Sequence, residues 1–352
     1  MATKILGLGK KLFYSLLIFS FFIYASDRIS RWVIVRFDLK TAVETMISSS
    51  IVFNALYVEF IEPDSKLIWR LKKNFIHHKK PILINSRGMR NGEFNEKKSE
   101  THQRILMMGD SCVFGWGVDQ NQTVSFHLEQ ILGQHRKVEV LNAGVPGYSS
   151  YQGLLYTNEV IKYSPDIVTI QLGFNDQWMT PVFNDRQILE YGLAHLGRLP
   201  TLNLPVIRKL WITRLTSYLL DKLFYGKFDV NNLSINYSKD RTRVSPAEFY
   251  SNIEKIIKKL KEEKIMPILV TSPHSKNQDE KLKNHDKYMN ILRDISRKNT
   301  VLLVDLHEKL QKKYKNNEEF FQWDGIHFNS KGTFEAAKIM AGIIDEYTNH
   351  RN

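Results

Sequence analysis

Cysteine is nearly absent from this chain of 352 residues, since Cys112 is the only one. A single cysteine excludes an intramolecular disulfide and a cysteine-rich zinc site. The sequence also lacks a His-Glu-x-x-His zinc motif, and no glycine-rich nucleotide fingerprint follows a predicted strand. We therefore expect neither a bound metal nor a cofactor.

Acidic residues are outnumbered by basic ones, 37 against 50, which gives a formal net charge of +13. The lysines lie in mixed runs such as 255–264, which is typical of a solvated helix face. No motif interleaves aromatic residues with a basic stripe, so nucleic acid is not an expected partner. A basic protein near an anionic cell envelope or an acidic glycan is the better interpretation.

Hydrophobic residues make up 43% of the chain and aromatic residues 12%, which is enough for a packed interior and excludes widespread disorder. The length exceeds what one hydrophobic core usually needs, so we expect appended segments. We divide the chain into an N-terminal signal-anchor or signal peptide (1–26), a partly β extension (27–102) and a main α/β domain (103–350). The main domain has an insertion at about 177–245.

Four short polar blocks stand out, and three of them directly follow apolar runs that we predict as strands at 104–108, 138–141 and 167–172. A predicted helix at 118–132 follows the first block. Ligand sites of open α/β sheets gather at the carboxyl ends of the strands, so we expect these blocks to meet. The blocks are Gly109-Asp110-Ser111, Asn142 to Gly147, Gly173 to Asp176, and Asp324-Gly325-Ile326-His327.

The blocks supply the residue types of a serine acyl-transfer site. Ser111 is the candidate nucleophile, and a serine hydroxyl needs a neighbouring imidazole to take its proton. His327 fits this role, with Asp324 three residues earlier to orient the ring and stabilise its cation. Gly147 and Asn175 are candidate donors to the oxyanion.

Two other histidines also follow predicted strands and are alternative bases. We interpret His307 as a polar residue at a helix start and His274 as lining the pocket. Asp110 and Asp176 are expected to accept backbone N–H groups that hold their loops. Cys112 has no separate base in the sequence, so we expect it to be a packing residue.

In these blocks the chain resembles the SGNH hydrolases, also called GDSL esterases and lipases, over roughly residues 103–347. The family's name-giving residues fall on Ser111, Gly147, Asn175 and His327, and Asp324 completes the triad. The resemblance implies a three-layer α/β/α sandwich with a central, mainly parallel five-stranded sheet. It also implies an oxyanion hole made by the N–H groups of Ser111 and Gly147 and the side-chain amide of Asn175.

The N-terminus has three lysines at 4, 10 and 11, followed by an uncharged apolar run at 12–25. As a helix the run would span about 21 Å, less than a hydrocarbon core of roughly 30 Å, which favours a cleaved signal peptide. The bulky Ile23 before a cleavage point at Ser26 favours an uncleaved signal-anchor instead. We predict a single membrane helix with the catalytic domain on the extracytoplasmic side. A secreted or periplasmic protein is the alternative, and a buried core helix is the remaining one.

Two further segments have a predicted structure. The extension should be a small β-rich addition packed on the main sheet, with a helix at 41–59 and short strands at 66–71 and 81–85. Within the insertion, residues 207–224 have the spacing of an amphipathic helix. This helix could cap the core, or act as a lid or membrane-facing element.

The residues and the resemblance together predict a serine esterase that works through an acyl-serine intermediate. The resemblance, and not the residues, implies acetyl or short-chain O-acyl esters of the cell envelope as substrates, with a short-chain lipid ester as the alternative. The substrate would be a small-molecule or glycan acyl ester. An O-acyltransferase that moves an acetyl group onto an envelope polysaccharide would use the same residues. A non-catalytic module that binds a glycan or a partner is a hypothesis of another class. The sequence indicates neither the acyl and alcohol groups nor the oligomeric state.

Overall fold

The computed structural model describes residues 2–37, 58–77, 81–180, 184–190, 210–212, 215–216, 219, 241–280 and 282–349. The helix predicted at 41–59 lies almost wholly outside these residues, and the helix predicted at 207–224 lies largely outside them.

The centre of the fold is a parallel sheet of five strands in the order β6-β5-β7-β8-β9. These are β5 (Gln103–Gly109), β6 (Val138–Gly144), β7 (Ile167–Gln171), β8 (Met266–Val270) and β9 (Leu302–Val304). The strands are largely buried on both faces, as expected of a parallel sheet covered by helices. β5 pairs with β6 on one side and with β7 on the other, so the strand order reverses at β5. The predicted five-stranded sheet is confirmed.

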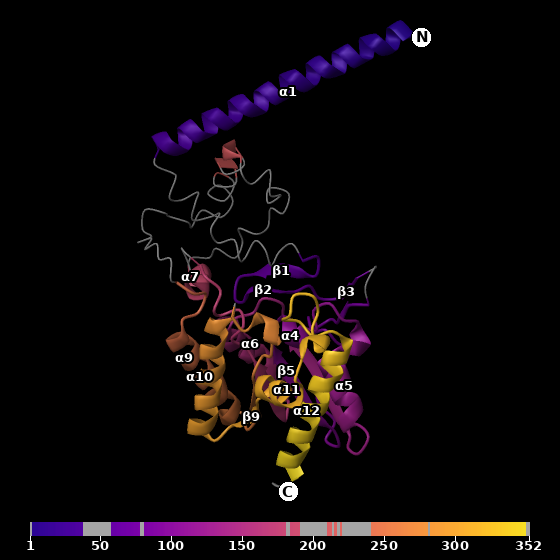
Figure 1. Cartoon of the computed structure of the whole chain (residues 1–352), viewed down its shortest axis with the longest axis vertical. Coiled ribbons are helices and arrows are strands. Elements are labelled where there is room, and N and C mark those ends of the chain that lie inside the picture. The colour runs from indigo at the N-terminus through magenta and orange to yellow at the C-terminus, as the bar shows by residue number, and fades with distance from the viewer. Residues whose placement is uncertain are drawn as a thin grey trace.

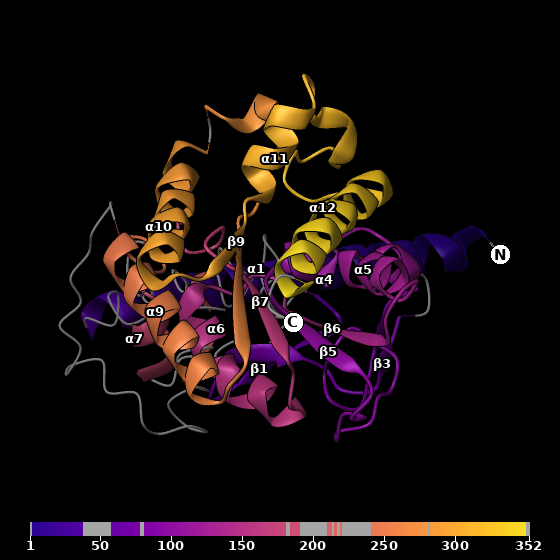
Figure 2. The same ribbon diagram turned by 90° about the horizontal axis from the view of Figure 1, so that it is seen from below.

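Helices cover both faces of the sheet (Figure 2), which confirms the three-layer arrangement. Alternate residues of β5 point to opposite faces: Leu106 and Met108 enter one core cluster, Ile105 and Met107 the other. The first cluster includes α6 (Ser150–Val160), α9 (Pro246–Glu262) and α10 (Lys283–Asn299). The second includes α5 (Val124–Leu132), α11 (Leu306–Lys313) and α12 (Ser330–Asn349).

Capping residues determine where the helices begin. The hydroxyl of Ser245 accepts from the N–H of Glu248 and Pro246 follows it, so α9 begins at Pro246. The helix predicted at 118–132 begins later than expected. Asp119 and Gln122 form a capping box on a short 3₁₀ turn, and Thr123 then caps α5. The predicted start was wrong because the polar residues at 119–123 favour caps over helix interior.

The N-terminal extension forms two small antiparallel pairs, β1 (Ile61–Asp64) with β2 (Ile68–Leu71) and β3 (Phe75–Ile76) with β4 (Leu83–Ile84). The strands at 66–71 and 81–85 are thus confirmed, although shorter than predicted. The indole of Trp69 bonds to the carbonyl of Pro146, and the Tyr148 hydroxyl donates back to the carbonyl of Trp69. The first pair therefore packs over the loop that follows β6, at the carboxyl edge of the sheet.

The chain begins with one helix, α1 (Ala2–Arg36), which Figure 1 shows beyond the β1–β2 end of the α/β body. The helix continues past residue 26. Asp27 accepts from the backbone N–H of Ile212, while the aromatic and aliphatic side chains from Tyr14 to Tyr24 are mostly exposed. Among the helices of the described residues, none has the length and continuous apolar character needed to cross a bilayer.

Candidate active site

Ser111 lies at the junction of β5 and a short helix, α4 (Ser111–Phe114). Asp110 caps this helix by accepting from the N–H of Cys112 at 2.9 Å. A Cβ on Gly144 would lie 2.2 Å from the backbone N of Phe114, so only glycine lets α4 lie this close to β6. The close approach fixes Ser111 at the carboxyl edge, beside the point where the strand order reverses.

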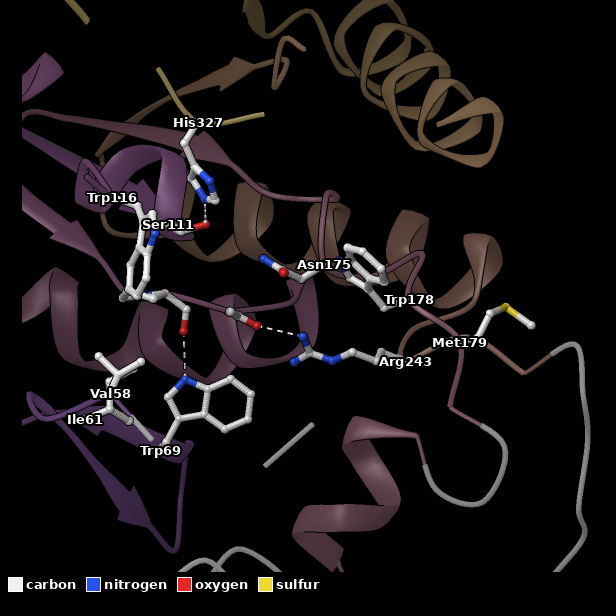
Figure 3. Close-up of a pocket in the computed structure, with 12 residues that line it drawn as sticks. Val58, Ile61, Trp69, Ser111, Trp116, Asn175, Trp178, Met179, Arg243 and His327 are labelled. Carbon is white, nitrogen blue, oxygen red and sulfur yellow. Dashed lines mark hydrogen bonds between the residues drawn. The ribbon is translucent and has the colours of Figure 1, made fainter. Parts of the chain in front are cut away.

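Three side chains from opposite ends of the main domain form a hydrogen-bonded row. Ser111 Oγ lies 2.8 Å from His327 Nε2 (Figure 3), and His327 Nδ1 lies 2.7 Å from Asp324 Oδ2. The other Asp324 oxygen accepts the backbone N–H groups of Ile326 and His327. In this geometry Nε2 can take the serine proton while Nδ1–H stays bonded to the carboxylate.

The path of α12 explains how His327 reaches Ser111. The loop that contains His327 comes after β9, which is at the far edge of the sheet from β5. α12 then crosses back and packs against α5, which covers β5 and β6. Gly325, at φ 69°, makes the left-handed turn that lets Asp324 face the ring of His327.

The Asp324 carboxyl has a lowered pKa. Burial acts to raise it, but the hydrogen bonds from the His327 ring and from the two backbone N–H groups together outweigh this effect. The group therefore remains a carboxylate at neutral pH and can stabilise an imidazolium.

Two backbone N–H groups, from residues that line one cavity, are available as donors. The structure gives the N–H groups of Ser111 and Gly147 no acceptor within its described residues. Gly147 has φ 81°. The carbonyl oxygen of the preceding residue, Pro146, and that of Gly147 itself each accept a hydrogen bond. Trp69 Nε1 donates to Pro146 O at 3.0 Å, and Arg243 Nη1 donates to Gly147 O at 2.8 Å (Figure 3). The orientation of the Gly147 N–H is thereby fixed in advance, as an oxyanion hole requires.

A cavity of about 360 Å³ opens beside the row, and its wall is mostly apolar. Four parts of the chain contribute to it: the N-terminal extension, the loops after β5, β6 and β7, the segment just before α9, and the loop before α12. The lining residues are Val58, Ile61, Trp69, Ser111, Trp116, Pro146, Gly147, Asn175, Trp178, Met179, Arg243 and His327.

Residues 107–333 match the family described as the GDSL-like Lipase/Acylhydrolase family. The chain belongs to the GDSL-like lipase/acylhydrolase family. It is a serine hydrolase. No curated protein sequence matches the chain.

The solved structures to which the chain is similar have low sequence identity with it. A lipase/acylhydrolase from Enterococcus faecalis is 19% identical, with a TM-score of 0.46 over 70% of this chain and 96% of that one. An esterase from Pseudoalteromonas sp. is 16% identical, with a TM-score of 0.43 over 70% and 99%. An acetylxylan esterase from Geobacillus stearothermophilus is 17% identical, with a TM-score of 0.43 over 69% and 92%.

Asn175, the third oxyanion donor implied by this family, lines the cavity of the hydrolase. Its Nδ2 donates to Asp110 Oδ2 and to the carbonyl of Tyr148, both at 3.1 Å. An amide nitrogen has two N–H groups, so both are already engaged. To donate to a substrate, Asn175 must exchange one of these bonds.

Asp110 and Asp176 hold loops, as predicted for both. Asp176 accepts from the backbone N–H and the hydroxyl of Ser150, and so ties the loop after β7 to the start of α6. Burial raises the pKa of Asp110 to about 6 and that of Asp176 to about 7. Burial, followed by the nearby Asp110 carboxyl, also raises the pKa of the Cys112 thiol, which fits a packing residue.

The two alternative histidines lie away from Ser111. His307 is in the first turn of α11, as expected of a helix-start residue, and burial lowers its pKa to about 4. The prediction that His274 lines the pocket was wrong. Its ring packs against His307, with centroids 4.7 Å apart, because the chain after β8 turns towards α11 instead of towards the cavity.

The sequence did not indicate two residues that support the site, Trp69 and Arg243. Trp69 lies in a predicted strand, but no motif connects it with a loop that follows it by 77 residues. Arg243 stands just before the capping box of α9, at the end of the insertion. A strongly basic residue followed by a helix cap is a common pattern on protein surfaces. The neighbouring sequence therefore did not indicate that Arg243 is buried against Asp185.

Proposed function

We propose that this serine hydrolase is an esterase that cleaves acetyl or other short-chain O-acyl esters of the cell envelope, with Ser111 as its nucleophile. The observation that carries the proposal is the 2.8 Å contact between Ser111 Oγ and His327 Nε2, with Asp324 bonded to the opposite ring nitrogen. Three candidate roles follow from these contacts: nucleophile, base and orienting carboxylate.

In the proposed reaction, Ser111 Oγ attacks the ester carbonyl while its proton moves to His327 Nε2. The new negative charge develops on the former carbonyl oxygen, where the N–H groups of Ser111 and Gly147 stabilise it. The C–O bond of the ester then breaks, and His327 gives its proton to the leaving alcohol. Water, deprotonated by the same histidine, releases the acid and restores Ser111.

The size and character of the cavity support a small acyl group. About 360 Å³ must hold the acyl chain and the part of the alcohol next to the ester. The indoles of Trp69, Trp116 and Trp178 give it flat apolar walls, which suit a methyl group or the face of a sugar ring. A glycan acetyl ester fits both features.

The test uses the purified full chain with 4-nitrophenyl esters of increasing chain length and with an acetylated oligosaccharide. Release of free acid, fastest for acetyl and short chains, supports the esterase. If acid is released only slowly and the acetyl group appears on an added sugar acceptor, the protein is an acyltransferase. Ser111→Ala should abolish both reactions and labelling by a fluorophosphonate, whereas Ser99→Ala, at an exposed position, should change neither. A wild-type protein that neither reacts nor takes the label would be a binding module.

The location in the cell envelope is proposed from the sequence: lysines at 4, 10 and 11 precede the uncharged apolar run at 12–25. An anchored protein should sediment with membranes and keep its N-terminus. A cleaved protein should appear outside the cytoplasm with a new N-terminus near residue 26. Recovery of the intact chain in the cytoplasmic fraction would contradict both.

A further inference from the structure

A group of histidines lies outside the catalytic row, at the carboxyl edge of the sheet beyond β8 and β9. His274 follows β8, His307 opens α11, and His285 lies in the first turn of α10. The His274 ring centroid is 4.7 Å from that of His307 and 5.6 Å from that of His285. His274, at the centre of the group, is only 2% exposed and so lies in the interior of the protein.

The cluster has ring nitrogens that lack hydrogen-bond partners. The buried side-chain atoms of the described residues that have no hydrogen-bond partner include His274 Nε2 and His307 Nδ1, together with His285 Nδ1. Buried polar atoms are nearly always satisfied, and an unsatisfied one needs an explanation such as an ion. Two of them in neighbouring rings point to a shared ligand.

The tautomer of His274 is fixed by its surroundings. Its Nδ1 lies 3.1 Å from the carbonyl of Ser275 and 3.4 Å from Asp279 Oδ1, and both of these oxygens can only accept. Nδ1 therefore carries the hydrogen, and Nε2 presents a lone pair. A ring that donates one N–H to a carbonyl or carboxylate and offers its other nitrogen is the usual arrangement of a metal-binding histidine.

A carboxylate completes the set. His274, His307 and Asp286 each offer a ligand atom, and these atoms lie within 4.8 Å of one another. In a tetrahedral site with bonds of about 2.0–2.1 Å, ligand atoms are about 3.4 Å apart, so a modest contraction is needed. Asp286 is exposed at the start of α10 and can supply it by rotating its side chain.

The remaining nitrogen of His307 also has a suitable neighbour. His307 Nε2 lies 3.2 Å from the side-chain amide of Gln311, one turn along α11. An amide can present either its oxygen or its nitrogen to the same neighbour. When it presents the oxygen, it accepts Nε2–H and leaves Nδ1 of His307 for a metal.

We propose that His274, His307 and Asp286 bind one divalent transition-metal ion, for which Zn²⁺ matches two imidazoles and one carboxylate. The ligands come from three separate parts of the chain and follow no spacing motif. The sequence therefore showed no sign of a metal site, and none was expected. The role assigned to the ion is structural. The N–H of Ser275, next to His274, donates to the carbonyl of Gly325 at 2.8 Å. A metal on His274 would thus brace the loop that contains Asp324 and His327.

The test is Zn²⁺ titration of the full chain after treatment with a chelator, followed by calorimetry and by metal analysis after dialysis. One Zn²⁺ per chain and a higher melting temperature are expected. Asp286→Asn, at an exposed position, should weaken binding by about tenfold or more without unfolding the protein. His307→Ala should weaken it further, and His127→Ala, a histidine of α5 outside the cluster, should leave it unchanged.

The result that would overturn the proposal is a wild-type chain that retains no Zn²⁺, or an Asp286→Asn variant with wild-type affinity. Ser111→Ala separates the metal site from the esterase proposal. This variant should bind Zn²⁺ like the wild type even though it cannot form an acyl-enzyme. Loss of Zn²⁺ binding in it would place the ion at the catalytic residues and contradict the assignment.

Discussion

Arg243 donates a hydrogen bond from Nη1 to the carbonyl oxygen of Gly147 at 2.8 Å, while its Nε and Nη2 hold both oxygens of Asp185. The arginine is buried, at 2% exposure, and lies at the end of the insertion. One side chain thus connects the end of the insertion with Gly147, a residue that lines the cavity.

Replacing Arg243 by Lys should lower kcat more than it raises KM. Lysine keeps the charge beside Asp185 but cannot reach both the carboxylate and the Gly147 carbonyl in the planar geometry of a guanidinium. We expect kcat for an acetyl ester to fall by roughly tenfold to a hundredfold, since a misplaced oxyanion donor affects the transition state. Arg70→Lys, in an ion pair with Glu159 away from the cavity, is the control. Equal kcat values in the two variants would exclude a positioning role.

Asp324→Asn should reduce kcat by about four orders of magnitude, because an amide cannot stabilise the imidazolium and favours the wrong tautomer of His327. Folding should be little affected, since the side chain is near the surface and its oxygen can still accept the backbone N–H groups. Steady-state kinetics with a 4-nitrophenyl acetyl ester measures the effect. Asp294→Asn, in an exposed ion pair, is the control. A loss of less than tenfold would assign the orienting role to another group.

Asn175→Ala tests whether this amide leaves its two acceptors to bind the oxyanion. If it does, kcat should fall by about a hundredfold to a thousandfold with little change in KM. If the amide serves only to hold Asp110 and the Tyr148 carbonyl, the variant should be less stable to urea but keep most of its kcat. The comparison of kcat with the free energy of unfolding distinguishes the two roles.

Asp176 should make stability depend on pH. Burial raises its pKa to about 7 in the folded protein, against 3.8 for the free side chain, so the folded state binds a proton that the unfolded state has released. This contribution is fully present below pH 3.8 and is lost as the pH rises through about 7. The free energy of unfolding of the wild type, measured in urea from pH 5 to about 8.5, should fall relative to Asp176→Asn by up to a few kcal/mol. Parallel curves for the two proteins would contradict the assignment.

The regular part of the fold could be predicted from the sequence because its signals are local. Runs such as 167–172 are apolar over the length of a strand, and Ser245 with Glu248 marks a helix start. The polar blocks at strand ends then required only the rule that parallel strands share a carboxyl edge. This rule predicts that Ser111, Gly147 and Asn175 lie close together, and all three line one cavity.

The supporting residues could not be predicted, since their roles depend on contacts distant in the chain. His274 illustrates the difference: its position after β8 suggested a place in the cavity, but the direction of the following loop sends it to His307. The sequence predicts Asn175 as an oxyanion donor, and only the packing of three loops shows that Asp110 and the Tyr148 carbonyl already accept from its side-chain amide.

Trp69 precedes the region that matches the family, which begins at residue 107. A gene trimmed to that boundary would encode the nucleophile, base and carboxylate. It would lack Trp69, so the Pro146 carbonyl would lose its hydrogen-bond donor and the cavity would lose one of its apolar walls. Exchanging such a fragment between relatives would separate the catalytic groups from a residue that holds one of their loops. In this enzyme the residues that support the catalytic loops extend beyond the region that matches the family.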